Sequence, residues 1–420
     1  MSFQQGLSGL HGASKHLEVI GNNVANASTV GFKQGQVQFA DAYANSMNRS
    51  GNSPVGIGVT VANVSQAFTQ GNIATTNNAL DVAINGDGFF RMAASLTDQS
   101  PRYGRNGQFQ LNKDGYLINP SMNGAYLTGY PAGTSGGDPV PLKIDTSTLP
   151  ATATTRVSTK VNLDSRKSVP TVNPFDPANP NSYSNSTGAT VYDSLGNPYS
   201  LQTFYVKGAA TGTPPSTTWS VYATLDGKTI VNAPPATGPQ LLGTLRFDAT
   251  GALTASTGMS LNLSTLAKGG ATFPGPIALG YTGSTQTGSA FANLAQSQDG
   301  MPPGTLSSFS IGKDGSIIGA YSNQQTRVMG QIVLANFANP HGLQPIGNNL
   351  YQASAAAGSA LLGSPTTGTF GALQGRAVEQ SNVDLTAELV NMIVAQRVYQ
   401  ANSQTIKVQD TVLQTLVSLR

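Results

Sequence analysis

Apolar residues recur at seven-residue spacing near both ends of the chain, and this spacing predicts helices. The series at the C-terminal end is Leu385, Met392, Tyr399, Ile406 and Leu413, with Leu389 and Val417 at interleaved positions. The series at the N-terminal end is Phe3, Leu10, Leu17 and Val24, with Leu7 interleaved. Asp384 directly precedes the second series and is a plausible N-cap. Each end of the chain is therefore expected to form an amphipathic helix.

The C-terminal helix is expected to need more than one partner. Three interleaved positions of its heptads are polar, namely Gln396, Ser403 and Asp410. A second apolar set lies off the first stripe and comprises Val390, Val394, Val398, Val408, Val412, Leu416 and Leu419. If the C-terminal helix packed only on its own domain, it would need a single apolar stripe. It has apolar residues on two sides, and the N-terminal helix has a similar seven-residue series. These patterns favour pairing of the two terminal helices, followed by lateral packing among copies of the chain.

A turn-forming motif follows the first helix. Asn22, Asn23 and Asn26 favour turns and left-handed backbone, so the helix is expected to end between residues 21 and 28. Gly31 and Phe32 mark the exit from it. Residues 29–70 are polar and turn-rich and are interpreted as an extended linker with short strands.

The middle of the chain has a β pattern. Lys113-Asp114-Gly115 and Lys313-Asp314-Gly315 each interrupt a similar alternating segment, which indicates two related hairpins far apart in the sequence. Further hairpins are predicted around residues 193–196 and 248–251, and a buried strand at 331–337.

These patterns predict a multidomain chain in which terminal α-helices form a coiled-coil-like domain and the other domains are mainly β, one inserted in the other. The expected parts are paired terminal helices (1–28 and 380–420), the linker (29–70), a middle β domain (71–145 and 285–372) and an inserted outer β domain (146–284).

The composition of the chain argues against several classes of function. Charged residues make up 10% of the 420 residues, there is no cysteine, and the net charge is +3 without basic runs. Nucleic-acid binding is not expected, and no apolar run is long enough for a membrane helix. The three histidines, His11, His16 and His341, do not share a metal-binding pattern. No catalytic, metal or cofactor site is predicted, and the chain is not expected to be an enzyme.

Several segments resemble the bacterial flagellar rod and hook axial protein family. They are Asn22 to Gln34 (NNVANASTVGFKQ), Ala79 to Phe90, Tyr103 to Asn119 and Ser381 to Asp410. The opening MSFQQGLSGL, the strand GQIVLANFANP and the long insertion look most like the hook-type members. The resemblance covers about half of the chain, with its motifs in the family's order.

The resemblance implies a structural subunit that polymerises into a curved, flexible tube, acting as a universal joint that passes torque from rod to filament. Implied partners are other copies of the chain, a distal rod protein, a hook-cap protein, a hook-filament junction protein and the flagellar type III export apparatus. The expected location is extracellular, after export without a cleaved signal peptide. Phe3, Leu7, Leu10, Leu17 and Val24 would form an assembly seam with the C-terminal series from Leu385 to Val417.

Two alternatives remain open at this stage. One is a distal rod or hook-filament junction subunit of the same family. The other belongs to a different class, an extracellular carbohydrate-binding β protein with helical extensions.

Overall fold

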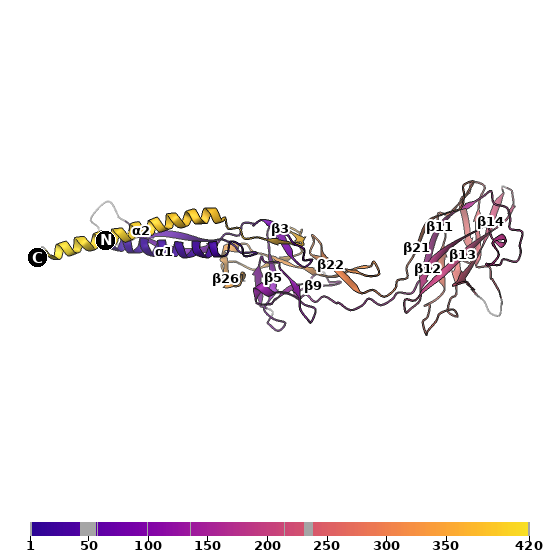
Figure 1. The fold of residues 1–420 in the computed structure, drawn as a ribbon, viewed down its shortest axis with the longest axis horizontal. Coiled ribbons are helices and arrows are strands. Elements are labelled where there is room, and N and C mark those ends of the chain that lie inside the picture. Colours follow the sequence, from indigo (N-terminus) through magenta and orange to yellow (C-terminus); the bar gives the residue numbers. More distant parts are fainter. Residues whose placement is uncertain are drawn as a thin grey trace. The chain divides into compact units, whose positions relative to one another are not determined.

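The computed structural model describes residues 2–42, 56, 58–98, 100–134, 136–213, 215–230 and 238–418. The chain forms two compact units. Unit 1 comprises Met1–Thr146, Ser307–Ala320 and Thr326–Arg420, and unit 2 comprises Ser147–Leu306 and Tyr321–Gln325. Both terminal helices belong to unit 1 (Figure 1).

The two predicted helices are confirmed as α1 (Ser2–Ala25) and α2 (Leu385–Ser418). Asp384 caps α2, because its Oδ1 accepts hydrogen bonds from the backbone N–H groups of Thr386 and Ala387 at 2.9 and 3.1 Å. The helices lie antiparallel, with Gly6 beside Ile406 near the start of α1 and Gln34, just after α1, bonded to Glu388. The last turns of α2 run past the start of α1 (Figure 1).

Small residues, not the predicted leucine series, form the centre of the α1 interface with α2. A Cβ on Gly6 would lie 3.1 Å from Ile406 Cγ1, and one on Gly9 would lie 2.6 Å from Asn402 Oδ1. Ala13 and Ile20 continue this buried side of α1 at seven-residue spacing. Glycine allows the two helices to approach closely along this line. Phe3, Leu10, Leu17 and Val24, the series expected to form the assembly seam, are not part of it and are exposed or partly buried.

The segment expected to be an extended linker contains a hairpin. Strands β1 (Gly35–Ala42) and β2 (Gly58–Gln66) pair antiparallel. The hairpin packs on α1, where Phe39 Cε1 and Val59 Cγ1 lie 3.3 and 3.4 Å from the position of a Cβ on Gly12. The short strands were predicted; their folding back along α1 was not. Residues 43–55 and 57 of the expected linker lie outside the described residues.

The β body of unit 1 is a twisted sheet with short additional ladders. The path of the main sheet is β22-β23-β24-β9-β5-β6-β27-β26. The strands of unit 1 after the hairpin are β3 (Ile73–Thr75), β4 (Val82–Asn85), β5 (Phe89–Ala93), β6 (Pro101–Gly104), β7 (Gln110–Leu111), β8 (Leu117–Asn119), β9 (Ala125–Pro131), β10 (Val140–Pro141), β22 (Leu306–Ile311), β23 (Ser316–Tyr321), β24 (Thr326–Ile332), β25 (Leu334–Asn336), β26 (Leu343–Gly347), β27 (Leu350–Ala353), β28 (Leu361–Gly363), β29 (Ala372–Gly375) and β30 (Ala377–Glu379). Short 3₁₀ turns lie at Pro120–Met122 and Pro340–Gly342.

Both Lys-Asp-Gly turns lie where they were predicted. β7 and β8 flank Gly115, and β22 and β23 flank Gly315. These glycines have φ values of 84° and 81°, which side-chain-bearing residues rarely adopt. The strand predicted at 331–337 is divided between β24 and β25, since pairing passes from β9 to β5 and β28 there.

Unit 2 consists of two sheets around its own core. One sheet contains β11 (Arg156–Asp164), β18 (Ser260–Leu261), β19 (Ile277–Gly280), β20 (Thr285–Thr287) and β21 (Ala292–Gln298). The other contains β12 (Asn185–Tyr192), β13 (Pro198–Thr211), β14 (Ser216–Leu225), β15 (Lys228–Thr229), β16 (Gly243–Phe247) and β17 (Leu253–Thr257). Trp219, Tyr205 and Phe247 are fully buried between them.

Unit 2 ends later than the insertion expected at residues 146–284. β21 pairs antiparallel with β11, which holds residues 292–298 in this unit. Bridges join Leu149 to Gly304 and Thr152 to Met301. Both ends of the insertion are therefore held together by backbone pairing over about 150 residues of sequence, which no local pattern reveals.

Candidate functional site: a buried junction and an exposed helix surface

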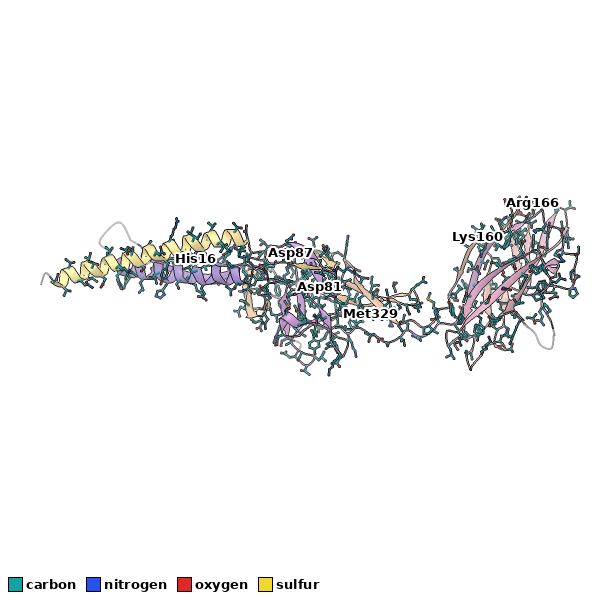
Figure 2. The ribbon with its side chains drawn as sticks, in the orientation of Figure 1. His16, Asp81, Asp87, Lys160, Arg166 and Met329 are labelled. Carbon is teal, nitrogen blue, oxygen red and sulfur yellow. The ribbon has the colours of Figure 1, made fainter. Side chains whose placement is uncertain are left out.

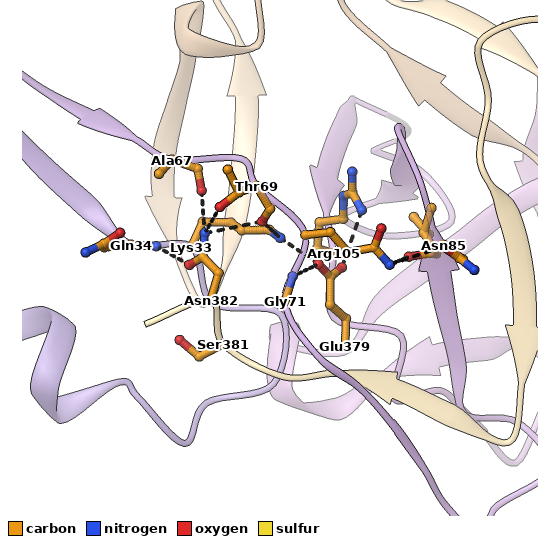
Figure 3. A network of polar contacts seen from close by, with 12 residues as sticks. Lys33, Gln34, Ala67, Thr69, Gly71, Asn85, Arg105, Glu379, Ser381 and Asn382 are labelled. Atoms are coloured by element: carbon orange, nitrogen blue, oxygen red, sulfur yellow. Dashed lines mark hydrogen bonds and ion pairs between the residues drawn. The ribbon is translucent and has the colours of Figure 1, made fainter. Parts of the chain in front are cut away.

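The junction between the helices and the β body is built around one carboxylate. Glu379 accepts from Lys33 Nζ at 2.6 Å and from the backbone N–H of Gly71 at 2.9 Å through Oε1. Its Oε2 lies 3.4 Å from Arg105 Nη1 (Figure 3). The side chains of Lys33 and Glu379 are 0% exposed and that of Arg105 is 3% exposed. One anion thus joins the exit of α1, the β body and the segment before α2.

Burial governs the electrostatics of this cluster. Desolvation lowers the pKa of the Lys33 ammonium, and the negative charge of Glu379 opposes that shift. Burial also lowers the pKa of the Arg105 guanidinium, again against the attraction of Glu379. Lys33 Nζ also donates to the Thr69 carbonyl at 2.8 Å and Arg105 Nη1 to the Gly86 carbonyl at 3.0 Å, whereas the buried Arg105 Nε has no hydrogen-bond partner among the described residues. The cluster is thus a hydrogen-bonded structural element that connects distant segments.

Asn382 adds a second connection on the same side. Its Nδ2 donates to the carbonyl of Ala67 at 2.8 Å, and its Oδ1 accepts from the backbone N–H of Gln34 at 2.7 Å (Figure 3). The side-chain amide of Gln34 donates through Nε2 to Glu388 Oε1 at 2.6 Å. The first turn of α2 is therefore bonded directly to the segment that leaves α1.

The predicted turn motif takes part in this junction. Asn23 is buried and exchanges two hydrogen bonds of 2.9 Å with the backbone of Gly35. Asn26 donates to the carbonyl of Asn22 at 2.9 Å and so closes the last turn of α1. Gly31 has φ +71°, and its N–H donates to the Glu379 carbonyl at 2.8 Å. The backbone N–H of Phe32 donates to the Thr29 carbonyl at 3.2 Å.

The residues predicted to form an assembly seam are not buried within the chain. Exposed members are Phe3, Leu7, Leu385, Leu389, Tyr399, Leu413 and Val417, and partly buried members are Leu10, Leu17, Val24, Met392 and Ile406. Ile406 lies beside Gly6 of α1, whereas Leu413 and Val417 are 56% and 76% exposed. A single chain therefore leaves most of this apolar set uncovered, and its role in assembly stays a prediction.

An apolar groove lies between α1, α2 and the hairpin. It has a volume of about 420 Å³. Its floor is Gly9, Gly12, Ala13 and Ala395, and its sides include Phe39, Val59, Val394 and Val398. His16 and Asn402 contribute its polar atoms, and Figure 2 shows His16 on α1. Sequence analysis noted the valines of α2 but missed the groove, because the hairpin that forms one side of it was interpreted as linker.

Sequence reasoning also missed the Lys33–Glu379–Arg105 cluster. Its members are separated by up to 346 positions in the chain. No local pattern reveals the pairing, since Lys33 lies between Phe32 and Gln34 and Glu379 lies between Val378 and Gln380.

Four family models match the two terminal helices and much of the β structure between them. The model of the flagella basal body rod protein matches residues 3–33, and that of the flagellar hook protein FlgE/F/G D1 domain matches residues 83–162. The flagellar basal body protein FlaE D2 domain matches residues 162–301, and the flagellar basal body rod FlgEFG protein C-terminal matches residues 374–419. The helices, the β body and unit 2 thus define a flagellar rod and hook axial protein.

Within this class, three full-length relatives are hook proteins. The flagellar hook proteins FlgE of Escherichia coli K12 and Salmonella typhimurium LT2 are each 44% identical over 100% of both chains. The FlgE of Borreliella burgdorferi is 31% identical over 100% of this chain and 99% of its own. The chain belongs to the flagellar hook protein family, and the resemblance seen in the sequence is confirmed.

A solved structure shares the fold. The crystal structure of Helicobacter pylori flagellar hook protein FlgE2 aligns with a TM-score of 0.54 at 17% identity, covering 73% of this chain and 100% of that one. The predicted fold class, terminal helices with mainly-β domains, is confirmed. In the described parts of the chain, no helix is both long enough and apolar enough to cross a bilayer.

Proposed function

We propose that this chain is the subunit of a flagellar hook, in which many copies join through their terminal helices into a curved, flexible tube. The tube acts as a universal joint that passes torque from rod to filament. The observation that carries the proposal is the uncovered apolar surface of α1 and α2 in a chain of this family. Apolar area of this extent on two sides of a helix is stable in water when other subunits cover it.

The proposed role is structural and not catalytic. The buried charged groups of the junction bond to one another and to backbone, which supports a function in holding helices and β body together. Proposed partners besides further copies are the distal rod protein, the hook-cap protein, the hook-filament junction protein and the type III export apparatus. The proposed location is the hook outside the cell, reached without a cleaved signal peptide.

The domain roles follow from this proposal. The helix pair would form the inner wall of the tube, the β body of unit 1 its middle layer and unit 2 its outer layer. The low charge content suits contacts that change register as the tube bends, since ion pairs would favour one register.

Complementation tests the proposal. In a cell lacking its own hook protein, this chain should restore a bent hook and motility. A straight rod-like extension, or failure to assemble despite export, would overturn the assignment as a hook subunit.

A further inference from the structure

The overhanging end of α2 is an apolar surface that the described residues of its own chain leave exposed. α1 has 24 residues and α2 has 34, and the helices are antiparallel with Gly6 beside Ile406. At ~1.5 Å per residue, the last eight residues of α2 therefore extend roughly 12 Å beyond the start of α1. Val412, Leu413 and Val417 lie on this overhang and are 51%, 56% and 76% exposed.

The groove between α1, α2 and the hairpin is the complementary surface. Apolar side chains of the groove are open to a partner, since Phe39, Val394 and Val398 are 43%, 54% and 46% exposed. His16 is the one titratable side chain among its lining residues. Such a site fits a few apolar side chains on one helix and has no fixed charge to select a charged partner.

The overhang cannot enter the groove of its own chain. Val398 and Leu413 are on the same straight helix, 15 positions and about 22 Å apart. Two different complementary patches on one subunit make a heterologous contact, which repeats from copy to copy and produces an open helical polymer. A second copy of this chain is therefore the occupant that the geometry favours.

We propose that the end of α2, with Leu413 and Val417, docks into the groove beside Val398 and Phe39 of the neighbouring copy. This inference rests on the proposed polymerisation and specifies which two surfaces meet. It differs from a symmetric pairing of like surfaces, because one copy supplies the overhang and the other supplies the groove.

Introduced cysteines test this contact cleanly, because the natural chain contains none. Tubes made from the double variant V398C/L413C should yield a ladder of disulfide-linked dimers, trimers and longer oligomers that collapses to monomer on reduction. A disulfide within one chain is excluded, since Cα atoms must approach within about 7 Å. The matched control is L361C/L413C, because Leu361 is a leucine with 59% exposure outside the groove.

A second arrangement covers the case in which the double variant does not assemble. Chains carrying V398C alone and L413C alone are mixed and polymerised with an excess of wild-type chain. Cross-linked heterodimers in the mixture, with none from either variant alone, support the contact. Tubes without heterodimers, or equal cross-linking of the Leu361 control, overturn it. Absence of tubes from the wild-type chain would instead refute the proposed polymerisation.

Discussion

At the scale of residues, Glu379 has the largest predicted effect on stability. Replacing it by glutamine leaves Lys33 and Arg105 buried without an anion, and breaking such a pair costs about 3–5 kcal/mol. We expect E379Q to lower the denaturation midpoint of unit 1 and to accelerate amide exchange at Gly71, which bonds to Glu379 Oε1. The control is E18Q, because the Lys15–Glu18 pair is solvent-exposed and contributes little. Equal effects of both substitutions would contradict the role of the junction.

Gly31 is the second critical residue. With φ +71°, an alanine would be strained, and its Cβ would lie 2.5 Å from the backbone nitrogen of Asn106. We expect G31A to destabilise unit 1 by at least ~1–3 kcal/mol, measured by urea unfolding. Gly21 provides the control, because it is within α1 and a Cβ there meets no atom within 4 Å. G21A should be neutral or stabilising by up to about 1 kcal/mol.

Asp164 in unit 2 gives a pH-dependent prediction. The Arg166 side chain donates to both carboxylate oxygens at 2.9 and 3.0 Å and holds the pKa of Asp164 at about 2. Because the folded pKa is depressed, the stabilisation from this pair is present above the ordinary pKa and is lost as pH falls toward 2. R166Q should raise the pKa of Asp164 toward 3.8, as measured by NMR titration of the carboxyl carbon. An unchanged titration would show that the pair does not persist in solution.

At the scale of elements, the terminal helices show what sequence can and cannot predict. The seven-residue series located α1 and α2, and Asp384 correctly predicted the start of α2. Within the single chain, Gly6 and Gly9 of α1 approach Ile406 and Asn402 of α2, and the role of the predicted apolar seam in assembly stays a prediction. Periodicity identifies an apolar side of a helix but not which partner covers it. In this chain, Gly6 and Gly9 face α2, whereas Phe3, Leu7, Leu413 and Val417 are exposed.

The exposed apolar residues near the end of α2 should matter for assembly and not for folding. L413D or V417D should leave the helix content of the monomer nearly unchanged in circular dichroism, because these side chains are 56% and 76% exposed among the described residues. Polymer recovered by sedimentation should fall at least tenfold, since a buried unpaired charge is costly at an interface. L361D, at a leucine of similar exposure in β28, is the control. Normal polymerisation of V417D and L413D would contradict the account.

The groove beside the β1–β2 hairpin and the Lys33–Glu379–Arg105 cluster could be predicted only in part from the sequence. The strands β1 and β2 were expected, but their packing on Gly12 depends on a shape complementarity that sequence spacing does not express. Lys33 and Glu379 are likewise 346 positions apart, so their pairing follows only from the fold.

At the scale of the whole molecule, the turn residues predicted the hairpins correctly, whereas the sequence did not predict where unit 2 ends. The Lys-Asp-Gly turns indicated two related hairpins on either side of an insertion, and both were found. The end of the main segment of unit 2 at Leu306 was not predictable, because it depends on long-range pairing of β21 with β11. The proposed hook function rests on family membership together with the uncovered helices of unit 1, and not on any single residue.

Electron microscopy of the purified chain under polymerising conditions tests this central claim most directly. The full chain should form tubes, and a chain truncated before Ser381 should remain monomeric with its β units folded. Persistent absence of tubes from the full chain, or tubes formed by the truncated chain, would contradict assembly through the terminal helices.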